Sequence, residues 1–221
     1  MTKLLIFDWD GTLCNSLSRI ALCIRCAAED VGLPPPPEHE AREIVGLGLV
    51  EALETLFPGI HMDQILAMRD SYSRHFVKHD REPSPFFKGV EETLGQLKDK
   101  GYLLTVATGK SRRGLDRVLK TRRLSHFFHG SRCADETAGK PNPLMLNELL
   151  QEFKMSPEEA MMVGDTEFDM AMAVNAGMPR VAVSYGAHSS DRLLKYQPLA
   201  CINEFKEIGK IINNLSKTMD Y

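Results

Sequence analysis

The stretch Leu4-Leu5-Ile6-Phe7-Asp8-Trp9-Asp10-Gly11-Thr12, near the start of the chain, decides the fold. Its four apolar residues are typical of a short strand that is buried on both faces, as in a parallel sheet. Asp8 and Asp10 follow directly, and because they lie two residues apart in extended backbone they point the same way. Gly11 then lets the chain turn. The stretch therefore predicts a buried strand that delivers two carboxylates to one edge of a sheet.

Three further apolar runs along the chain also end in turn or acidic residues. They are Tyr102–Ala107 before Thr108-Gly109, Ala160–Val163 before Gly164-Asp165, and Val181–Val183 before Ser184-Tyr185-Gly186. Helical signals lie between them: the apolar spacing of Val90–Lys98, a helix start with N-cap, proline and acids at Ser156–Glu159, and Asp169–Ala176, which ends at Gly177. Strands that alternate with helices predict an α/β fold with a parallel sheet.

The segment from about Ser16 to Ser84 has a different character. It holds four stretches with helical periodicity and no convincing strand: Ser18–Asp30, Glu38–Val45, Leu49–Phe57 and Asp63–His79. The proline-rich pieces Pro34–Pro37 and Pro83-Ser84-Pro85 are typical of linkers and boundaries. We therefore predict a discontinuous core domain, residues 1–15 and 85–221, with a small helical domain of residues 16–84 inserted after the first strand.

The composition and charge of the chain exclude some classes of partner and indicate a compartment. The chain has 221 residues, 43% of them hydrophobic and 26% charged, with a net charge of −3, so neither nucleic acid nor an anionic membrane is an expected partner. The first apolar run is too short for a signal peptide, and no stretch has the length of a membrane span. Five cysteines, an odd number in a chain of this size, fit a reducing compartment. We expect a cytoplasmic protein.

Acidic and hydroxyl residues gather where the predicted strands end. Asp8, Asp10, Thr108, Asp165 and Asp169 all lie at carboxyl ends of strands, which is where open α/β sheets bind ligands. Four carboxylates in one crevice would repel one another unless a cation lies among them. Hard oxygen ligands with no His or Cys beside them in the sequence favour Mg²⁺. Lys140 is the natural second cation.

Four motifs, in this order and spacing, resemble those of the haloacid dehalogenase superfamily. Asp8-Trp9-Asp10-Gly11-Thr12 is similar to its first motif, DxDGT, and Thr108-Gly109-Lys110 to its second. Gly139-Lys140-Pro141 is similar to the third, and Gly164-Asp165-Thr166 with Asp169 to the fourth. One such motif would be weak evidence, but four in order are specific. The resemblance covers essentially the whole chain and implies a Rossmann-like parallel sheet core with an inserted helical cap of type 1.

The resemblance also implies a role for each of these residues. Asp8 would be the nucleophile that forms an aspartyl-phosphate, and Asp10 would protonate the leaving oxygen and later activate water. The Thr108 hydroxyl, the Gly109 amide and the Lys140 ammonium would hold the phosphoryl oxygens in the transition state. The implied activity is that of a phosphatase acting on phosphate monoesters.

A metal ion is part of the same implied mechanism. Mg²⁺ would be held by Asp8, the backbone carbonyl of Asp10 and Asp165, with Asp169 ligating it directly or through water. Two positions depart from the usual pattern. Trp9 stands where a smaller apolar residue is more common, and its side chain is expected to point away from the crevice. Gly109 stands where many relatives have Asn, a change that leaves the backbone amide in place.

The insert itself resembles that of bacterial phosphoglycolate phosphatases. The matching pieces are Gly32–Pro36 and Val45–Gly48, with Tyr185-Gly186 after the last predicted core strand. Gly46 is expected in a flexible cap loop that faces the active site, with Arg42 nearby as an anion contact. Relatives with pyrophosphatase, phosphosugar phosphatase or phosphomutase activity share these pieces. The expected substrate is therefore a small phosphorylated metabolite.

Other functions stay open at this point. A phosphomutase of the β-phosphoglucomutase type would use the same core motifs, and a non-catalytic binding protein could retain the fold. Dehalogenases of the superfamily lack an acid at the position of Asp10, which argues against that activity. The basic run Arg112–Arg123 is interpreted as an exposed helix, because the overall charge is negative and aromatic residues are not interleaved. The oligomeric state is not predicted.

Overall fold

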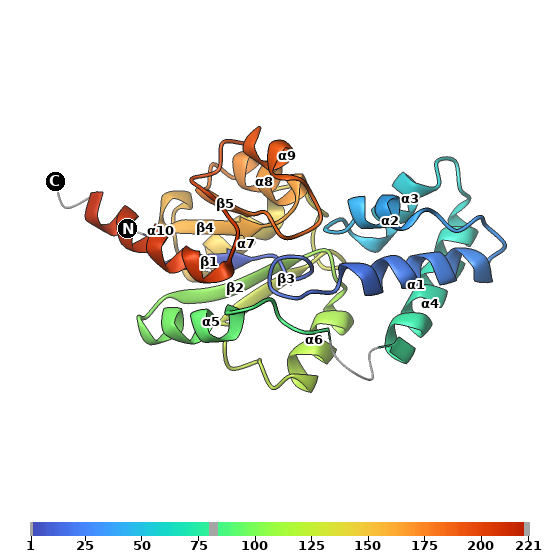
Figure 1. Ribbon diagram of the computed structural model, residues 1–221, viewed down its shortest axis with the longest axis horizontal. Coiled ribbons are helices and arrows are strands. Elements are labelled where there is room, and N and C mark those ends of the chain that lie inside the picture. The colour runs from blue at the N-terminus through green and yellow to red at the C-terminus, as the bar shows by residue number, and fades with distance from the viewer. Residues whose placement is uncertain (1, 80–83, 219–221) are drawn as a thin grey trace.

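A computed structural model describes residues 2–79 and 84–218, and its core is one parallel sheet. The strand order is β3-β2-β1-β4-β5-β6, and every neighbouring pair runs parallel. This order places β1 and β4 in the middle of the sheet (Figure 1). The arrangement confirms the predicted α/β fold. The strands are β1 (Leu4–Phe7), β2 (Leu103–Thr108), β3 (Gly130–Cys133), β4 (Ala160–Gly164), β5 (Arg180–Val183) and β6 (Cys201–Ile202).

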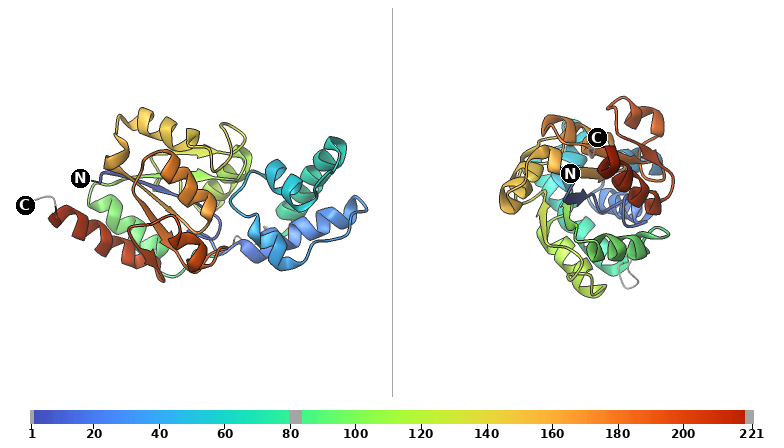
Figure 2. Two further views of the ribbon diagram at one scale, coloured as in Figure 1. Left: turned by 90° about the horizontal axis from the view of Figure 1, so that it is seen from above. Right: turned by 90° about the vertical axis from the view of Figure 1, so that its left-hand side faces the viewer.

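Helices cover both faces of this sheet. Leu5 and Phe7 of β1 pack with α5 (Val90–Asp99), α6 (Arg112–Thr121) and α10 (Ile208–Thr218) on one face. Leu4 and Ile6 pack with α7 (Leu144–Phe153) and α8 (Glu167–Asn175) on the other. Successive strand residues point to opposite faces, so a strand covered on both sides must be apolar throughout. Figure 2 (left) shows α7 on the opposite side of the sheet from α5 and α10.

Four helices between β1 and α5 form a separate body beside the sheet, which we call the helical insert. They are α1 (Leu17–Asp30), α2 (Glu38–Glu43), α3 (Leu49–Leu56) and α4 (Met62–His79), close to the four stretches predicted from periodicity. The insert has its own buried clusters, one around Ile20, Ile24 and Phe76, the other around Leu53 and Met68. It lies at the end of the core where β1 leads into Asp8 (Figure 1).

The chain crosses between core and insert twice, and the two crossings are hydrogen-bonded to each other. Asn15 N donates to Pro85 O at 2.8 Å, and Phe87 N donates to Leu13 O at 3.0 Å. Cys14 and Phe86 form an antiparallel bridge between them. Pro83 of the predicted linker lies outside the described residues, and the domain boundaries at 16 and 84 stay a prediction.

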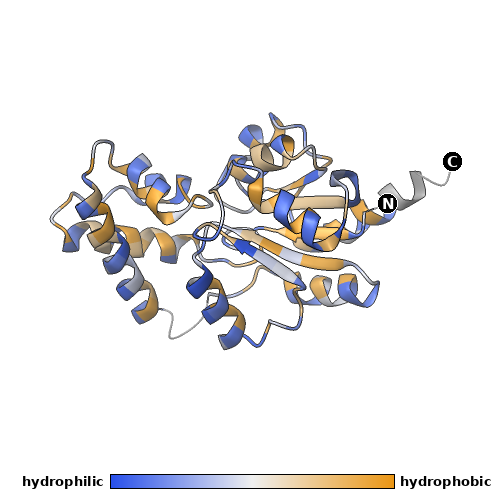
Figure 3. Ribbon diagram, turned by 180° about the vertical axis from the view of Figure 1, so that it is seen from behind, coloured by the Kyte–Doolittle hydropathy of each residue, from blue (hydrophilic) through white to orange (hydrophobic). Residues whose placement is uncertain are grey.

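Several elements differ from the sequence predictions or were not among them. Ser156–Glu159 does not start an α-helix: Pro157–Glu159 is a single 3₁₀ turn with a capping box, and β4 begins directly at Ala160. The edge strands β3 and β6 were not predicted. β3 consists of Gly-Ser-Arg-Cys and is hydrophilic among otherwise hydrophobic strands (Figure 3), while β6 has only two residues. Within the described residues, no helix is both long and apolar enough to cross a membrane.

Candidate active site

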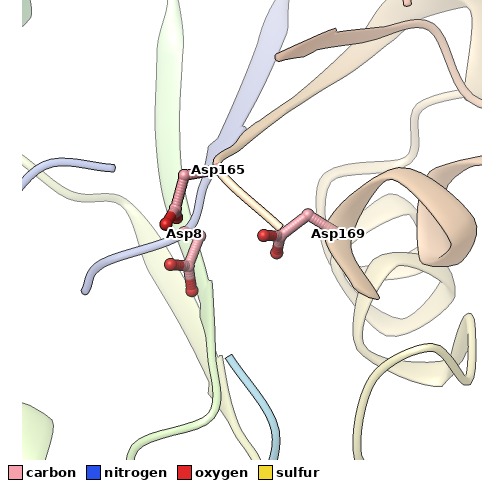
Figure 4. A group of neighbouring side chains, drawn as sticks. All are labelled: Asp8, Asp165 and Asp169. Atoms are coloured by element: carbon pink, nitrogen blue, oxygen red, sulfur yellow. The ribbon is translucent and has the colours of Figure 1, made fainter. Parts of the chain in front are cut away.

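Three carboxylates and one ammonium group are buried together at the carboxyl end of the sheet. Asp8 directly follows β1, Asp165 directly follows β4, and Asp169 lies in the first turn of α8 (Figure 4). One oxygen of each carboxylate lies within 4.8 Å of the others. Lys140 Nζ is 2.5 Å from Asp8 Oδ1 and 2.6 Å from Asp169 Oδ1. The predicted convergence of these four residues, which lie as much as 161 positions apart, is confirmed.

Burial and neighbouring charges shift the pKa values of the groups in this cluster. Desolvation raises the pKa of Asp8 well above its usual value, opposed by Lys140. Desolvation and the neighbouring Asp169 raise the pKa of Asp165 to about 7. Burial alone would lower the pKa of Lys140, but Asp169 and Asp8 raise it above its ordinary value, so the lysine is charged. Three ionised carboxylates against one ammonium would leave two negative charges, the charge that a divalent cation balances.

The start of α8 positions Asp169, and contacts outside that helix position Asp165. Thr166 is the N-cap of this helix: its hydroxyl donates to Asp169 Oδ2 at 2.7 Å and accepts from Asp169 N at 3.3 Å. Asp165 precedes the N-cap and therefore lies outside the helix that carries Asp169. Asp165 is held instead by Thr12 Oγ1 at 2.7 Å and Ala187 N at 2.8 Å.

One oxygen of Asp8 has no partner. Asp8 Oδ2 is buried and makes no hydrogen bond to any described residue, while Oδ1 is bound by Lys140. Buried polar atoms are rarely left without a partner, so this oxygen points to something that binds there. With three carboxylates as the donor set, the residues fit a hard divalent cation.

Asp10 lies beside this cluster and has its own partners. Ser16 Oγ donates to Asp10 Oδ1 at 2.5 Å, and Lys110 Nζ is 2.9 Å from Asp10 Oδ2. Its carboxylate does not belong to the group that could share a metal ion, so any contact of Asp10 with the metal would use its backbone carbonyl. Asp8 and Asp10 both line one large cavity between the core and the helical insert.

The helical insert contacts the core closely at Gly109. A Cβ atom added to Gly109 would lie 2.3 Å from Leu47 O and 2.7 Å from Gly46 O. Only a residue without a side chain fits under this backbone. Thr108, 1% exposed, lies beside it and accepts a hydrogen bond from Lys110 N at 3.2 Å. Thr108, Gly109 and Gly46 therefore all line the cavity, as predicted for the phosphate-binding residues.

Arg42 lies elsewhere. It is not among the described residues that line the cavity, and its guanidinium is 3.9 Å from Glu38 on the same helix. The structure thus does not bring Arg42 to the site, because α2 turns it along its own surface. Trp9 points away from the cavity as predicted: it is fully buried and packs edge-on against Phe86 and Phe128.

Several residues at the site were missed by sequence reasoning. Lys110 belongs to a recognised motif, and its position after Gly109 was a usable signal. Ser16 and Thr12 follow the first motif but carried no distinguishing pattern. His188 accepts from Glu167 N at 3.0 Å and donates through Nε2 to Glu43 O of the insert at 2.9 Å. Nothing in the sequence indicated this bridge between α8 and the insert.

Comparisons with known proteins agree with this geometry. A family model described as haloacid dehalogenase-like hydrolase matches residues 5–183. The phosphoglycolate phosphatase of Mannheimia succiniciproducens is 30% identical over 95% of this chain and 98% of its own. That of Vibrio cholerae is 30% identical over 89% and 90%. A solved hydrolase of the haloacid dehalogenase-like family from Streptococcus pneumoniae superimposes with a TM-score of 0.81 at 25% identity, over 98% of each chain.

The match extends over most of the chain, and it includes all the strands that carry the buried carboxylates. The chain therefore belongs to the haloacid dehalogenase-like hydrolases. Within this family it is a phosphatase, a hydrolase of phosphoric monoesters.

Proposed function

We propose that the protein hydrolyses a small phosphorylated metabolite through an aspartyl-phosphate on Asp8, with Mg²⁺ as cofactor. The observation that carries this proposal is the unpartnered oxygen of Asp8. Asp8 Oδ2 is buried and lies in a residue that lines the cavity, while Lys140 fixes the other oxygen. This leaves one oxygen with its lone pairs free in a residue that lines the cavity, which is what a nucleophile requires.

Asp10 is suited to the proton transfers. In the first step the Asp8 oxygen bonds to phosphorus, the bond to the leaving oxygen breaks, and Asp10 gives that oxygen a proton. In the second step water attacks phosphorus, Asp10 takes its proton, and the bond to Asp8 breaks. Ser16 and Lys110 hold the Asp10 carboxyl from two sides, and this fixes its orientation for both steps.

Other residues would bind the transferring group. Thr108 and Gly109 line the cavity, so the Thr108 hydroxyl and the Gly109 amide would bind phosphoryl oxygens, and Lys140 adds a fixed positive charge. Asp8, the Asp10 carbonyl, Asp165 and Asp169 would hold Mg²⁺. When bound, the ion offsets the repulsion between these carboxylates and an anionic phosphate. Lys140 also bridges Asp8 and Asp169 and offsets the repulsion between their carboxylates.

The substrate class rests on the relatives. Two curated relatives named phosphoglycolate phosphatase cover most of this chain, which supports a small phosphate monoester as substrate. The same core motifs would serve a phosphomutase of the β-phosphoglucomutase type or a pyrophosphatase. These differ in what the helical insert retains or admits, so they are alternatives for the same experiment.

The test is phosphate release from a panel of compounds. Purified protein is incubated with Mg²⁺ and phosphoglycolate, pyrophosphate, sugar phosphates or nucleotides. Release should disappear on chelating the metal, and Asp8→Asn should lower it by a factor on the order of 10³ or more. Asp63→Asn, an exposed acid on α4, serves as the matched control. Product formation only with a sugar bisphosphate activator would indicate the mutase, and full activity of Asp8→Asn would exclude Asp8 as nucleophile.

A further inference from the structure

The cavity above Asp8 is larger than a two-carbon phosphate ester needs. Its volume is about 970 Å³. Pockets that enclose drug-sized molecules typically measure about 300–1,000 Å³, so this one lies at the upper end of that range. A molecule the size of phosphoglycolate would leave most of it unfilled.

This volume is present although the helical insert is docked on the core. On one side, the Gly46 and Leu47 carbonyls lie directly over Gly109. On the other side, the ring of Phe76 in α4 packs under two core cations, Lys110 Nζ at 4.8 Å and the Arg117 guanidinium at 5.4 Å from its centroid. The cavity between these contacts is therefore a feature of the docked arrangement and does not arise from separation of the two parts.

Apolar and cationic side chains share the lining of this cavity. Apolar side chains of the insert form part of the walls, among them Ile20, Ile24 and Val45. The lining is also rich in cations from α4 of the insert and α6 of the core, and we call those that do not pair with Asp8 or Asp10 the outer lining. The residues that α4 contributes run from Arg69 to Lys78, about 13 Å at 1.5 Å rise per residue. The cations of this outer lining are Arg69, Arg74, Lys78, Arg113 and Arg117.

The acids near the floor do not neutralise these cations. Asp8 is paired with Lys140 and Asp10 with Lys110, so both are already compensated. Asp135 accepts a hydrogen bond from Arg112 N at 2.8 Å. Among the outer cations, Arg69 pairs with Asp70 at 3.0 Å, Arg74 lies 3.8 Å from Asp30, and Arg117 packs on the ring of Phe76.

Two of the outer cations are available for a ligand. Arg113 and Lys78 are exposed, and neither forms an ion pair or hydrogen bond with any residue that the structure describes. They come from different parts of the molecule, α6 of the core and α4 of the insert. Both line the same cavity, so a negative group in it can be contacted by the core and by the insert.

We propose that the leaving group of the substrate is an extended chain or ring that carries a second anionic group, a carboxylate or phosphate, at the end far from the scissile phosphate. The scissile phosphate lies at Asp8, the body lies along the apolar walls, and the distal anion lies at Arg113 and Lys78. This inference rests on the proposed phosphatase function and narrows its substrate class. It excludes phosphoglycolate as the preferred substrate, because its carboxylate is only two carbons from the phosphate oxygen.

A matched pair of compounds tests the distal anion. 6-Phosphogluconate and sorbitol 6-phosphate have the same six-carbon chain and differ at the far end, where one has a carboxylate and the other an alcohol. We expect kcat/KM to be at least about tenfold higher for 6-phosphogluconate, through a lower KM, as one charge-assisted hydrogen bond typically provides. It should also exceed kcat/KM for phosphoglycolate.

Three variants locate the effect. Arg113→Glu and Lys78→Glu should each reduce the preference for 6-phosphogluconate to near unity, because they raise KM for 6-phosphogluconate more than KM for sorbitol 6-phosphate. Lys120→Glu makes the same charge change on an exposed face of α6 that does not line the cavity, and it should keep the preference. Equal turnover of the pair, preference for phosphoglycolate, or an equal effect of Lys120→Glu would overturn the inference.

Binding to Asp8→Asn, measured by calorimetry, separates this inference from the proposed function. Loss of all hydrolysis by the unmodified protein, with 6-phosphogluconate still bound more tightly than sorbitol 6-phosphate, would refute the phosphatase mechanism and support the anion site. Normal hydrolysis with equal affinities would support the mechanism and refute the anion site.

Discussion

Replacement of Gly109 by alanine tests how closely the helical insert must approach the core. The added Cβ would lie 2.3 Å from Leu47 O, whereas ordinary contact begins near 3.4 Å. The carbonyl would therefore have to retreat by about 1 Å, and it is backbone, so no side-chain rotation can relieve the overlap. A misplacement of about 1 Å in a positioned site can cost about 10²-fold in rate. We expect kcat/KM of Gly109→Ala to fall by about tenfold to a hundredfold.

The assay compares activity with stability. Gly109→Ala should change the free energy of unfolding by less than about 1 kcal/mol, because the overlap is relieved by moving the loop and not the core. Gly95→Ala is the control: in α5 an added Cβ would meet only Phe127, at 4.0 Å, and alanine should stabilise the helix by about 1 kcal/mol without altering activity. Unchanged kcat/KM in Gly109→Ala would refute the reasoning that the loop over Gly109 positions the substrate.

Two further predictions concern the buried charges. In urea unfolding with a chelator present, Lys140→Met should lower the free energy of unfolding by about 3–5 kcal/mol, because it leaves Asp8 and Asp169 without their shared cation. Mg²⁺ should restore part of this loss. The control Lys3→Met, which breaks an exposed ion pair with Glu159, should cost at most about 1 kcal/mol. The pKa of Asp165 is raised to about 7 in the folded protein. Between about pH 4 and pH 7, and without metal, the folded state therefore holds a proton that the unfolded state has lost. The free energy of unfolding should fall as pH rises through this range, by up to about 1.4 kcal/mol per pH unit. Mg²⁺ competes with that proton, so the increase in Tm on adding Mg²⁺ should become larger between about pH 5.5 and 7.5. A Tm increase that stays constant or becomes smaller as pH rises would contradict metal binding at Asp165.

The fold was predictable where burial is uniform. β1, β2, β4 and β5 lie inside the sheet and are apolar because both faces are covered, so the sequence pattern identifies them. β3 lies at one edge, and its Arg132 pairs with Glu148 at 2.6 Å, so it needs no apolar run. β6, at the other edge, is too short to produce a pattern.

The site was predictable as far as the core motifs reach. Strand ends converge by topology, so Asp8, Thr108 and Asp165 could be placed together without coordinates. The direction of a side chain on the helical insert depends on how that insert docks, and sequence gives no such information. This is why Arg42 was expected at the cavity. Arg113 does lie on an exposed helix, as predicted, but its place in the cavity lining depends on how the insert docks beside α6. The fit of Gly109 under the Leu47 carbonyl is likewise a tertiary contact.

The hydrogen-bonded pair of crossings between Asn15 and Pro85 has a consequence for how such molecules diversify. The segments that enter and leave the insert are hydrogen-bonded to each other, so the two points where the insert joins the core lie side by side. A different helical segment could be spliced between these points while the strands and their carboxylates keep their positions. The chain is in this sense modular: the helical insert can be exchanged without moving the buried carboxylates.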